Sequence, residues 1–218
     1  MLIRCPYPDC FFTYDLAIPG SSRFILTRSR CPNCQKEGTA ASLEICSMLQ
    51  ERAKLNRQRP PAGQQFQVLL ENVRSLWNVG SIFRTADAVG ADILYLCGIT
   101  GCPPKRQITK TALGAEQFVP WQYFAHALDI IPQLKEQGIC ILGLERNQTS
   151  ANLATFLKEK KFSKPLCLVI GNENQGLSPE TLHYCDYVCG LPMQGKKESL
   201  NAAVAFGVAT YLINEFTS

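Results

Sequence analysis

Residues 166–178 read LCLVIGNENQGLS, and residues 187–201 read YVCGLPMQGKKESLN. Each stretch begins with a short apolar run, which predicts a buried strand, and then breaks into a polar loop that contains glycine. Loops that follow neighbouring parallel strands meet at one edge of a sheet. Their backbone N–H and C=O groups suit a flat, polar ligand such as an adenine nucleoside. The two stretches therefore predict an α/β fold with such a site between the loops.

The chain from residue 66 onward alternates between strand and helix patterns, which is typical of a mostly parallel sheet with helices on both faces. Serine followed by proline at Ser178-Pro179 predicts the start of a short helix. Glycine at 138 predicts the end of another, and Pro132 interrupts that helix pattern. The predicted strands are 66–71, 93–97, 139–144, 166–170 and 187–192, and the predicted long helices are 76–89, 125–137 and 200–216.

Three parts are expected along the chain: a small module at 1–38, a helix and basic linker at 39–65, and one α/β domain at 66–218. Helical periodicity covers 40–56, and the proline- and arginine-rich segment 57–63 reads as a linker. No run of about 18 apolar residues exists, so no membrane span is predicted. The N-terminus lacks the apolar core of a signal peptide.

Positive charge gathers before residue 66. Residues 1–65 contain nine Lys/Arg and five Asp/Glu, whereas residues 66–218 contain thirteen of each. A basic appendage on a neutral domain favours a polyanionic partner, although a solvated surface without a partner is the alternative.

Eleven cysteines could indicate a secreted disulfide framework, but their placement indicates otherwise. Cys97, Cys140 and Cys167 lie in apolar runs, where a reduced cysteine behaves as a small hydrophobe. A cytoplasmic protein is therefore expected.

Four other cysteines form two close pairs, Cys5-x4-Cys10 and Cys31-x2-Cys34. Two such pairs can supply a tetrahedral set of four thiolates, which suits structural Zn²⁺. About forty residues bury too little apolar surface to fold alone, and a metal would make up the deficit. With short strands expected at 11–14 and 24–27, the module resembles a zinc ribbon. Four buried cysteines without a metal, or an iron–sulfur cluster, are the alternatives.

Three motifs carry a resemblance to a known family. They read NVGSIFR at 78–84, GNENQGLS at 171–178 and GKKESLNAAVA at 195–205. In this order they resemble the motifs of the SpoU/TrmH class of SPOUT RNA methyltransferases, over about residues 66–216. The resemblance implies methyl transfer from S-adenosylmethionine to a ribose 2′-hydroxyl of tRNA or rRNA. It also implies a C-terminal trefoil knot and a homodimer.

The resemblance assigns roles to residues of this chain. The implied catalytic residues are Asn78, Arg84, Glu173, Ser199 and Asn201. The implied cofactor-binding residues are Leu144, Gly171, Gly176, Leu191, Met193 and Leu200. With an RNA partner implied, the candidate RNA-binding residues are Arg23, Arg28, Arg30, Arg57 and Arg59 before the domain, and Lys105, Arg106 and Lys110 within it.

Some of these roles have structural alternatives. The family assigns Arg84 to activating the ribose hydroxyl, but guanidinium is always protonated, so we favour stabilisation of the developing alkoxide. Glu173 could pair with Arg84 and orient it. Asn78 or Ser199 could simply cap a helix. His126 and His183 show no metal or triad spacing and are interpreted as structural.

Two other enzyme classes fit the sequence poorly. No G-x-G-x-x-G follows a predicted strand, which disfavours a dinucleotide-dependent oxidoreductase. No P-loop spacing occurs, which disfavours an NTPase. The alternative that stays open is a non-catalytic RNA-binding protein that retains the fold.

Overall fold

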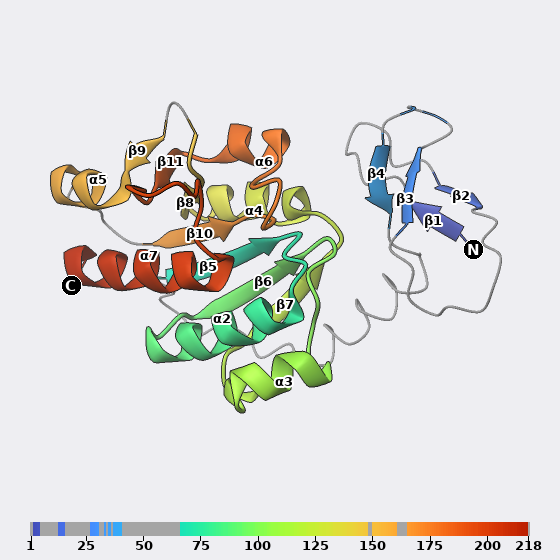
Figure 1. Ribbon diagram of the computed structural model, residues 1–218, viewed down its shortest axis with the longest axis horizontal. Coiled ribbons are helices and arrows are strands. Elements are labelled where there is room, and N and C mark those ends of the chain that lie inside the picture. The colour runs from blue at the N-terminus through green and yellow to red at the C-terminus, as the bar shows by residue number, and fades with distance from the viewer. Residues whose placement is uncertain are drawn as a thin grey trace. The chain divides into compact units, whose positions relative to one another are not determined.

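The computed structural model describes residues 2–4, 13–15, 27–30, 33, 35, 37–40, 66–147, 150–160 and 165–217 (Figure 1). The chain divides into two compact units, Met1–Leu55 and Asn56–Ser218. In the first unit, β1 (Leu2–Arg4) pairs antiparallel with β2 (Thr13–Asp15), and β3 (Thr27–Arg30) pairs antiparallel with β4 (Glu37–Ala40). The strands expected at 11–14 and 24–27 thus lie one to three residues further along where they are described. Of the predicted helix at 40–56, Ala40 instead ends β4, and the remainder lies outside the described residues.

The second unit is built on a seven-stranded sheet in the order β7-β6-β5-β10-β8-β11-β9. Every strand pairing in this sheet is parallel, as the alternating pattern predicts. The strands are β5 (Phe66–Glu71), β6 (Ile93–Cys97), β7 (Trp121–Phe124), β8 (Cys140–Leu144), β9 (Ala151–Asn152), β10 (Leu166–Ile170) and β11 (Tyr187–Gly190).

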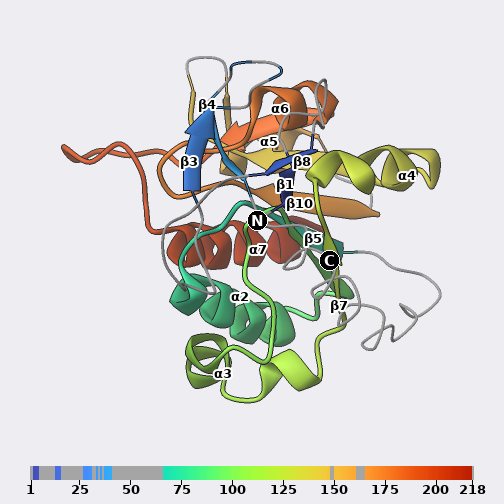
Figure 2. The ribbon, with the colours of Figure 1, turned by 90° about the vertical axis from the view of Figure 1, so that its right-hand side faces the viewer.

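Helices cover both faces of this sheet. The α-helices are α2 (Leu76–Ala88), α3 (Arg106–Ala112), α4 (Ile131–Glu136), α5 (Leu153–Glu159), α6 (Pro179–Tyr184) and α7 (Ala202–Thr217), with 3₁₀ turns η1 (Ala115–Gln117) and η2 (Ala127–Asp129). Figure 2 shows α2, α3 and α7 on one face and α4 and α6 on the other. On the α4 side, Ile131 and Leu134 pack with Leu69, Tyr95 and Val169 of the sheet. The strands β5, β6 and β10 are buried throughout, because both of their faces are covered.

The structure corrects the prediction at several elements. The helix expected at 125–137 is split into η2 and α4, and Pro132 lies in the first turn of α4, where its missing N–H costs nothing. Helix α3, which was not predicted, contains Arg106 and Lys110, and Lys105 is its N-cap. The short elements β7, α5 and β9 lacked a clear pattern and were not predicted.

The parallel arrangement brings the loops after β5, β8, β10 and β11 to one edge of the sheet. Strands β5 and β10 are neighbours there, although the chain proceeds from β5 outward to β6 and β7 and later returns to β10. Such a switch point is where open parallel sheets place their ligands. The loop after β10 reaches the loop after β5, since Asn172 Nδ2 donates to the Asn72 carbonyl at 2.8 Å.

None of the helices described for this chain is both long enough and apolar enough to cross a membrane.

Candidate active site

Glu173 holds the start of α2. Its carboxylate accepts hydrogen bonds from the backbone amides of Arg74 (2.9 Å) and Ser75 (3.0 Å) and from Asn78 Nδ2 (3.0 Å). Partial burial works to raise the pKa of Glu173, but these hydrogen bonds outweigh it and leave the pKa below its ordinary value. The carboxylate is therefore ionised at neutral pH. The expected pairing of Glu173 with Arg84 is wrong, because backbone amides and Asn78 surround the carboxylate instead.

Asn78 links Glu173 to Asn201. A carboxylate only accepts hydrogen bonds, so the Asn78 amide nitrogen must face Glu173 and its Oδ1 must face away. That Oδ1 accepts from Asn201 Nδ2 at 3.0 Å. We call the series Glu173, Asn78 and Asn201 the carboxylate–amide chain. It joins one residue from each of the three sequence motifs and so brings segments about a hundred residues apart into one site.

The carboxylate–amide chain ends at α7. Asn201 Oδ1 accepts from the amides of Ala203 (3.0 Å) and Val204 (3.3 Å), which makes Asn201 the N-cap of this helix. The capping role considered for Ser199 is therefore wrong, and this exposed residue precedes the cap by two positions. The cap considered for Asn78 is wrong too, because Ser75 Oγ accepts from the Asn78 amide and caps α2.

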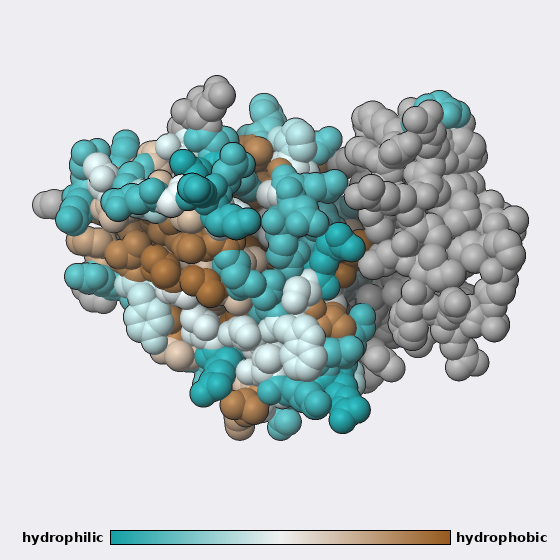
Figure 3. All heavy atoms as spheres, in the orientation of Figure 1, coloured by the Kyte–Doolittle hydropathy of each residue, from teal (hydrophilic) through white to brown (hydrophobic). Residues whose placement is uncertain are grey.

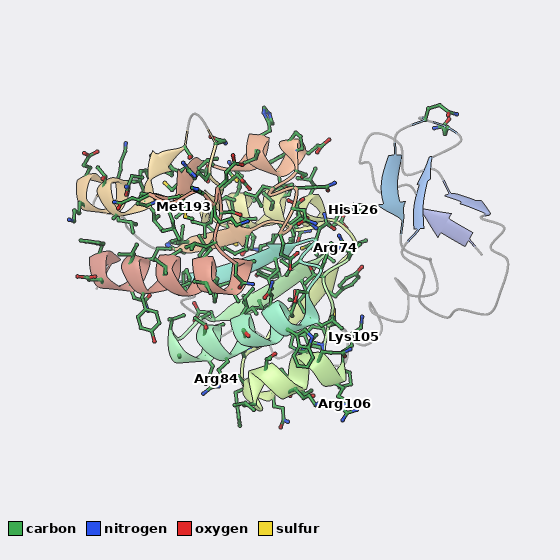
Figure 4. All side chains as sticks on the ribbon, viewed as in Figure 1. Arg74, Arg84, Lys105, Arg106, His126 and Met193 are labelled. Carbon is green, nitrogen blue, oxygen red and sulfur yellow. The ribbon has the colours of Figure 1, made fainter. Side chains whose placement is uncertain are left out.

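Arg84 lies apart from the carboxylate–amide chain. Six residues of α-helix separate it from Asn78, which places the two side chains about 120° apart around α2 and about 9 Å apart along it. Arg84 is exposed and has no hydrogen bond or ion pair with any residue that the structure describes. Figure 4 shows it projecting from α2 away from Met193. The structure thus does not bring Arg84 to the other predicted catalytic residues of its own chain.

Two glycines shape the loop after β10. A side chain on Gly171 would overlap the backbone of residues 176–177, and Gly176 has a φ of +70° that disfavours other residues. The amides of Asn172 and Gly176 exchange hydrogen bonds with each other's carbonyls at 2.9 Å, which closes the loop. At its far end, the buried Glu71 accepts from Ser178 Oγ (2.8 Å) and thereby ties the loop back to β5.

The loop after β11 contains the remaining predicted cofactor residues. Leu191 and Met193 are partly buried, Leu200 is exposed, and residues 192–200 have neither helix nor strand structure. Leu144 ends β8 beside this loop, since β8 and β11 are paired. Arg146 Nη1 donates to the Glu198 carbonyl at 3.1 Å and connects the loop after β8 to the loop after β11. Residues 144, 171, 176 and 191 thus lie at the exits of three adjacent strands.

A basic and aromatic surface lies on α2 and α3, the helices that follow β5 and β6. Arg74, Arg106 and Lys110 are exposed, and their side chains have no hydrogen bond or ion pair with any described residue, while Lys105 is partly buried. Trp77, which the sequence reasoning did not single out, is 49% exposed in the first turn of α2. The sequence did contain a signal for Trp77, because an aromatic residue directly precedes the motif residue Asn78. We call Arg74, Trp77, Arg106 and Lys110 the basic–aromatic surface.

The predicted N-terminal sites lie largely outside what the structure describes. Cys5, Cys10, Cys31 and Cys34 are outside the described residues, as are Arg23, Arg57 and Arg59. Arg28 and Arg30 lie in β3, and their side chains are not described. Among the residues that are described, no group of His, Cys, Asp or Glu could hold a metal ion.

The internal cysteines agree with the prediction of reduced, apolar packing. Cys97 and Cys167 are buried in β6 and β10 and form no disulfide. Burial raises the pKa of the Cys167 thiol and, for the half-buried Cys140, raises it to about 11. Thiols of this kind are unreactive at neutral pH.

The two histidines differ in their surroundings. The His126 amide donates to Asp129 Oδ2 at 3.0 Å at the start of η2, and Figure 4 shows this residue on the same side of the domain as Arg74. His183 packs its ring edge-on against Tyr184 on α6.

Known proteins share both the sequence and the fold of this unit. Residues 65–211 match the SpoU rRNA Methylase family. A Staphylococcus haemolyticus protein named as a TrmH family tRNA/rRNA methyltransferase is 31% identical over 82% of this chain and 70% of its own length. For YacO of Bacillus subtilis, which carries the same family name, identity is 34% over 68% of this chain and 57% of the relative.

Solved structures agree with these relatives. AviRb from Streptomyces viridochromogenes, a SpoU methyltransferase solved with AdoMet, has a TM-score of 0.66 and 28% identity, over 73% of this chain and 63% of AviRb. The TrmH/SpoU tRNA modifying enzyme of A. aeolicus has a TM-score of 0.64 and 29% identity, over 78% of this chain and 84% of that enzyme. The three motifs, the parallel sheet and these similarities lead to one conclusion: this chain belongs to the SpoU/TrmH class of SPOUT methyltransferases.

Proposed function

We propose that this chain transfers a methyl group from S-adenosylmethionine to a ribose 2′-hydroxyl of tRNA or rRNA. The observation that carries the proposal is the carboxylate–amide chain, which joins all three family motifs at the ligand-binding edge of the sheet. The family membership and the AdoMet-bound relative support it.

The residues at this edge suit a nucleoside cofactor. The loop at 192–200 has few internal hydrogen bonds, so its backbone N–H and C=O groups can meet the edge of an adenine ring. Leu144, Leu191 and Leu200 would pack against the faces of the ring, and Gly171 permits close approach of the backbone. S-adenosylmethionine supplies an activated methyl group, so the residues of the chain have only to align it with the acceptor hydroxyl.

On the hydroxyl side, we assign stabilisation of charge to Arg84. As the 2′-hydroxyl attacks the methyl carbon and loses its proton, negative charge on the oxygen is favoured by a nearby guanidinium. A permanently protonated arginine does not suit the role of proton acceptor. Ser199, exposed beside Asn201, is then a candidate hydrogen-bond partner for the ribose.

A homodimer would explain how Arg84 reaches a cofactor site. The exposed side of α7 carries Val204, Val208 and Tyr211, at 52%, 43% and 60% exposure, and Figure 3 shows an apolar band over this helix. Their spacing of four and three residues puts them on one stripe, which favours burial against another surface. Because α2 packs beside α7, we propose that two copies associate through this region and that Arg84 of each serves the site of the other.

RNA contact is assigned to the basic–aromatic surface and to the basic N-terminal third. Arg74, Lys105, Arg106 and Lys110 can bind phosphates, and the exposed indole of Trp77 can stack on an unpaired base. The candidates Arg23, Arg28, Arg30, Arg57 and Arg59 would add further phosphate contacts from the N-terminal third of the sequence.

Two further features of the prediction remain proposals. A trefoil knot is supported by the path of the chain, which runs from β11 near one end of the sheet back to α7 beside α2. Zinc binding by Cys5, Cys10, Cys31 and Cys34 is supported by their positions. Along the sequence, one cysteine pair falls in the connection from β1 to β2, and the other falls in the connection from β3 to β4. Elemental analysis that finds zinc in equal amount to the protein would support this site, and its absence would reject it.

The methyl transfer itself is tested by incubating the full-length chain with methyl-labelled S-adenosylmethionine and total tRNA or rRNA. A 2′-O-methyl group blocks alkaline cleavage of the adjacent phosphodiester, so label should appear in alkali-resistant dinucleotides. Label in the mononucleotides that alkali releases would place the methyl group on a base. RNA binding without methyl transfer would favour the non-catalytic alternative.

A further inference from the structure

Glu145 occupies a position where the loops after three neighbouring strands meet. It directly follows β8, and its amide donates to the Cys189 carbonyl of β11 at 3.0 Å. Its carboxylate Oε2 accepts from the Leu177 amide, in the loop after β10, at 2.9 Å. A side chain on Gly176 would overlap this carboxylate. Glu145 is therefore held in place from two sides, in the middle of the proposed cofactor site.

Only one oxygen of this carboxylate is used. Oε1 of Glu145 accepts no hydrogen bond from any residue that the structure describes. This oxygen is not completely buried, because Trp121 Nε1 is the one fully buried polar side-chain atom without a partner in the described part of the chain. A carboxylate that is fixed through Oε2 and keeps an unused, partly accessible Oε1 is a pre-organised acceptor for a ligand with hydroxyl donors.

We propose that Glu145 accepts hydrogen bonds from the vicinal 2′- and 3′-hydroxyls of the ribose of the cofactor. This inference rests on the proposed function, since it takes S-adenosylmethionine as the ligand. Leu144 and Gly176, the immediate neighbours of Glu145, are both in the proposed cofactor set. A diol offers two donors to an acceptor-only group, and a carboxylate at a strand exit binds ribose in this way in dinucleotide-binding folds. The RNA backbone is a poor alternative, because its phosphates would be repelled.

The test measures binding rather than turnover. S-adenosylhomocysteine and its 2′,3′-dideoxy analogue are titrated by calorimetry into the full-length chain and into the Glu145→Gln variant. The wild type should bind the dideoxy analogue about tenfold or more weakly, since it loses hydrogen bonds to a charged group. Glu145→Gln should bind S-adenosylhomocysteine about tenfold more weakly but bind the dideoxy analogue as the wild type does. Glu180→Gln, which removes a charge from nearby α6, should behave as the wild type.

Each result has a distinct meaning. If the wild type binds both ligands equally, or if Glu145→Gln weakens both by the same factor, Glu145 does not contact the ribose and the inference is wrong. The comparison of the two ligands on the wild type can refute the inference even if the variant fails to fold. A wild-type chain that binds neither ligand would instead contradict the proposed function itself.

Discussion

Asn78 and Arg84 lie on the same helix, six residues apart, yet their surroundings are opposite. Both polar atoms of the Asn78 side chain are in hydrogen bonds within the carboxylate–amide chain. Arg84 is exposed and makes no contact of this kind with any described residue. A side chain whose polar groups all make hydrogen bonds within the protein is suited to fixing the positions of loops, whereas a cation without a partner in the protein is suited to binding a ligand. The comparison separates residues that build the site from a residue that we propose acts on the substrate.

The largest effect is expected from Arg84→Ala. If Arg84 stabilises the alkoxide, methyl transfer should fall by about a hundredfold to a thousandfold, as when one oxyanion donor is removed. Affinity for S-adenosylhomocysteine, measured by calorimetry, should stay within a few-fold, because Arg84 lies away from the cofactor loops. Arg84→Lys keeps the positive charge but lacks the paired N–H donors of the guanidinium group, so it should recover part of the rate. Near-normal turnover in Arg84→Ala would refute the assignment.

A smaller and different effect is expected from Glu173→Gln. The change leaves amide donors of Arg74, Ser75 and Asn78 facing a neutral group, so the free energy of unfolding should fall by about 1–2 kcal/mol. Turnover and cofactor affinity should both fall, because two loops and the start of α2 shift together. Chemical denaturation and calorimetry measure the two quantities. Glu136→Gln, an exposed change at the end of α4, is the control. Loss of turnover alone, with stability and affinity intact, would make Glu173 a catalytic residue instead.

The smallest effect is expected on the basic–aromatic surface. Arg106→Gln combined with Lys110→Gln should weaken RNA binding several-fold and lower the slope of log affinity against log salt by about 2 at most. Fluorescence anisotropy at several salt concentrations gives this slope. Lys158→Gln with Lys160→Gln, at the C-terminal end of α5, makes the same change in net charge and serves as the control. Equal slopes for both double variants would remove α3 from the RNA interface.

Sequence patterns located the central strands well, because β6 and β10 are apolar along their whole length and β5 is apolar except at Gln67 and Glu71. The patterns located Gly171 and Glu173 at a strand exit for the same reason, and they located Asn201 at the start of the last helix. The sequence could not show that Glu173 faces α2 and not Arg84, since that depends on which loops cross the edge of the sheet. Glu145 was missed because a single carboxylate after a strand has no distinctive spacing. Its position in the site became apparent only from the contacts of its carboxylate with Leu177 and Gly176, which lie about thirty residues away in the chain.

The claim that Arg84 acts on the other copy can be tested directly by mixing two inactive variants. Arg84→Ala lacks the cation, and Gly171→Ala should lack cofactor binding, because the added methyl group overlaps the backbone at residues 176–177. Light scattering must first show that both variants form dimers, and calorimetry must show that Gly171→Ala no longer binds S-adenosylhomocysteine.

Random exchange of subunits in an equal mixture makes half of the dimers mixed, and each mixed dimer then contains one complete site. The mixture should therefore methylate RNA at about a quarter of the wild-type rate, although each variant alone is inactive. A mixture as inactive as its two parents, with mixed dimers present, would show that Arg84 acts only within its own chain and would contradict this account.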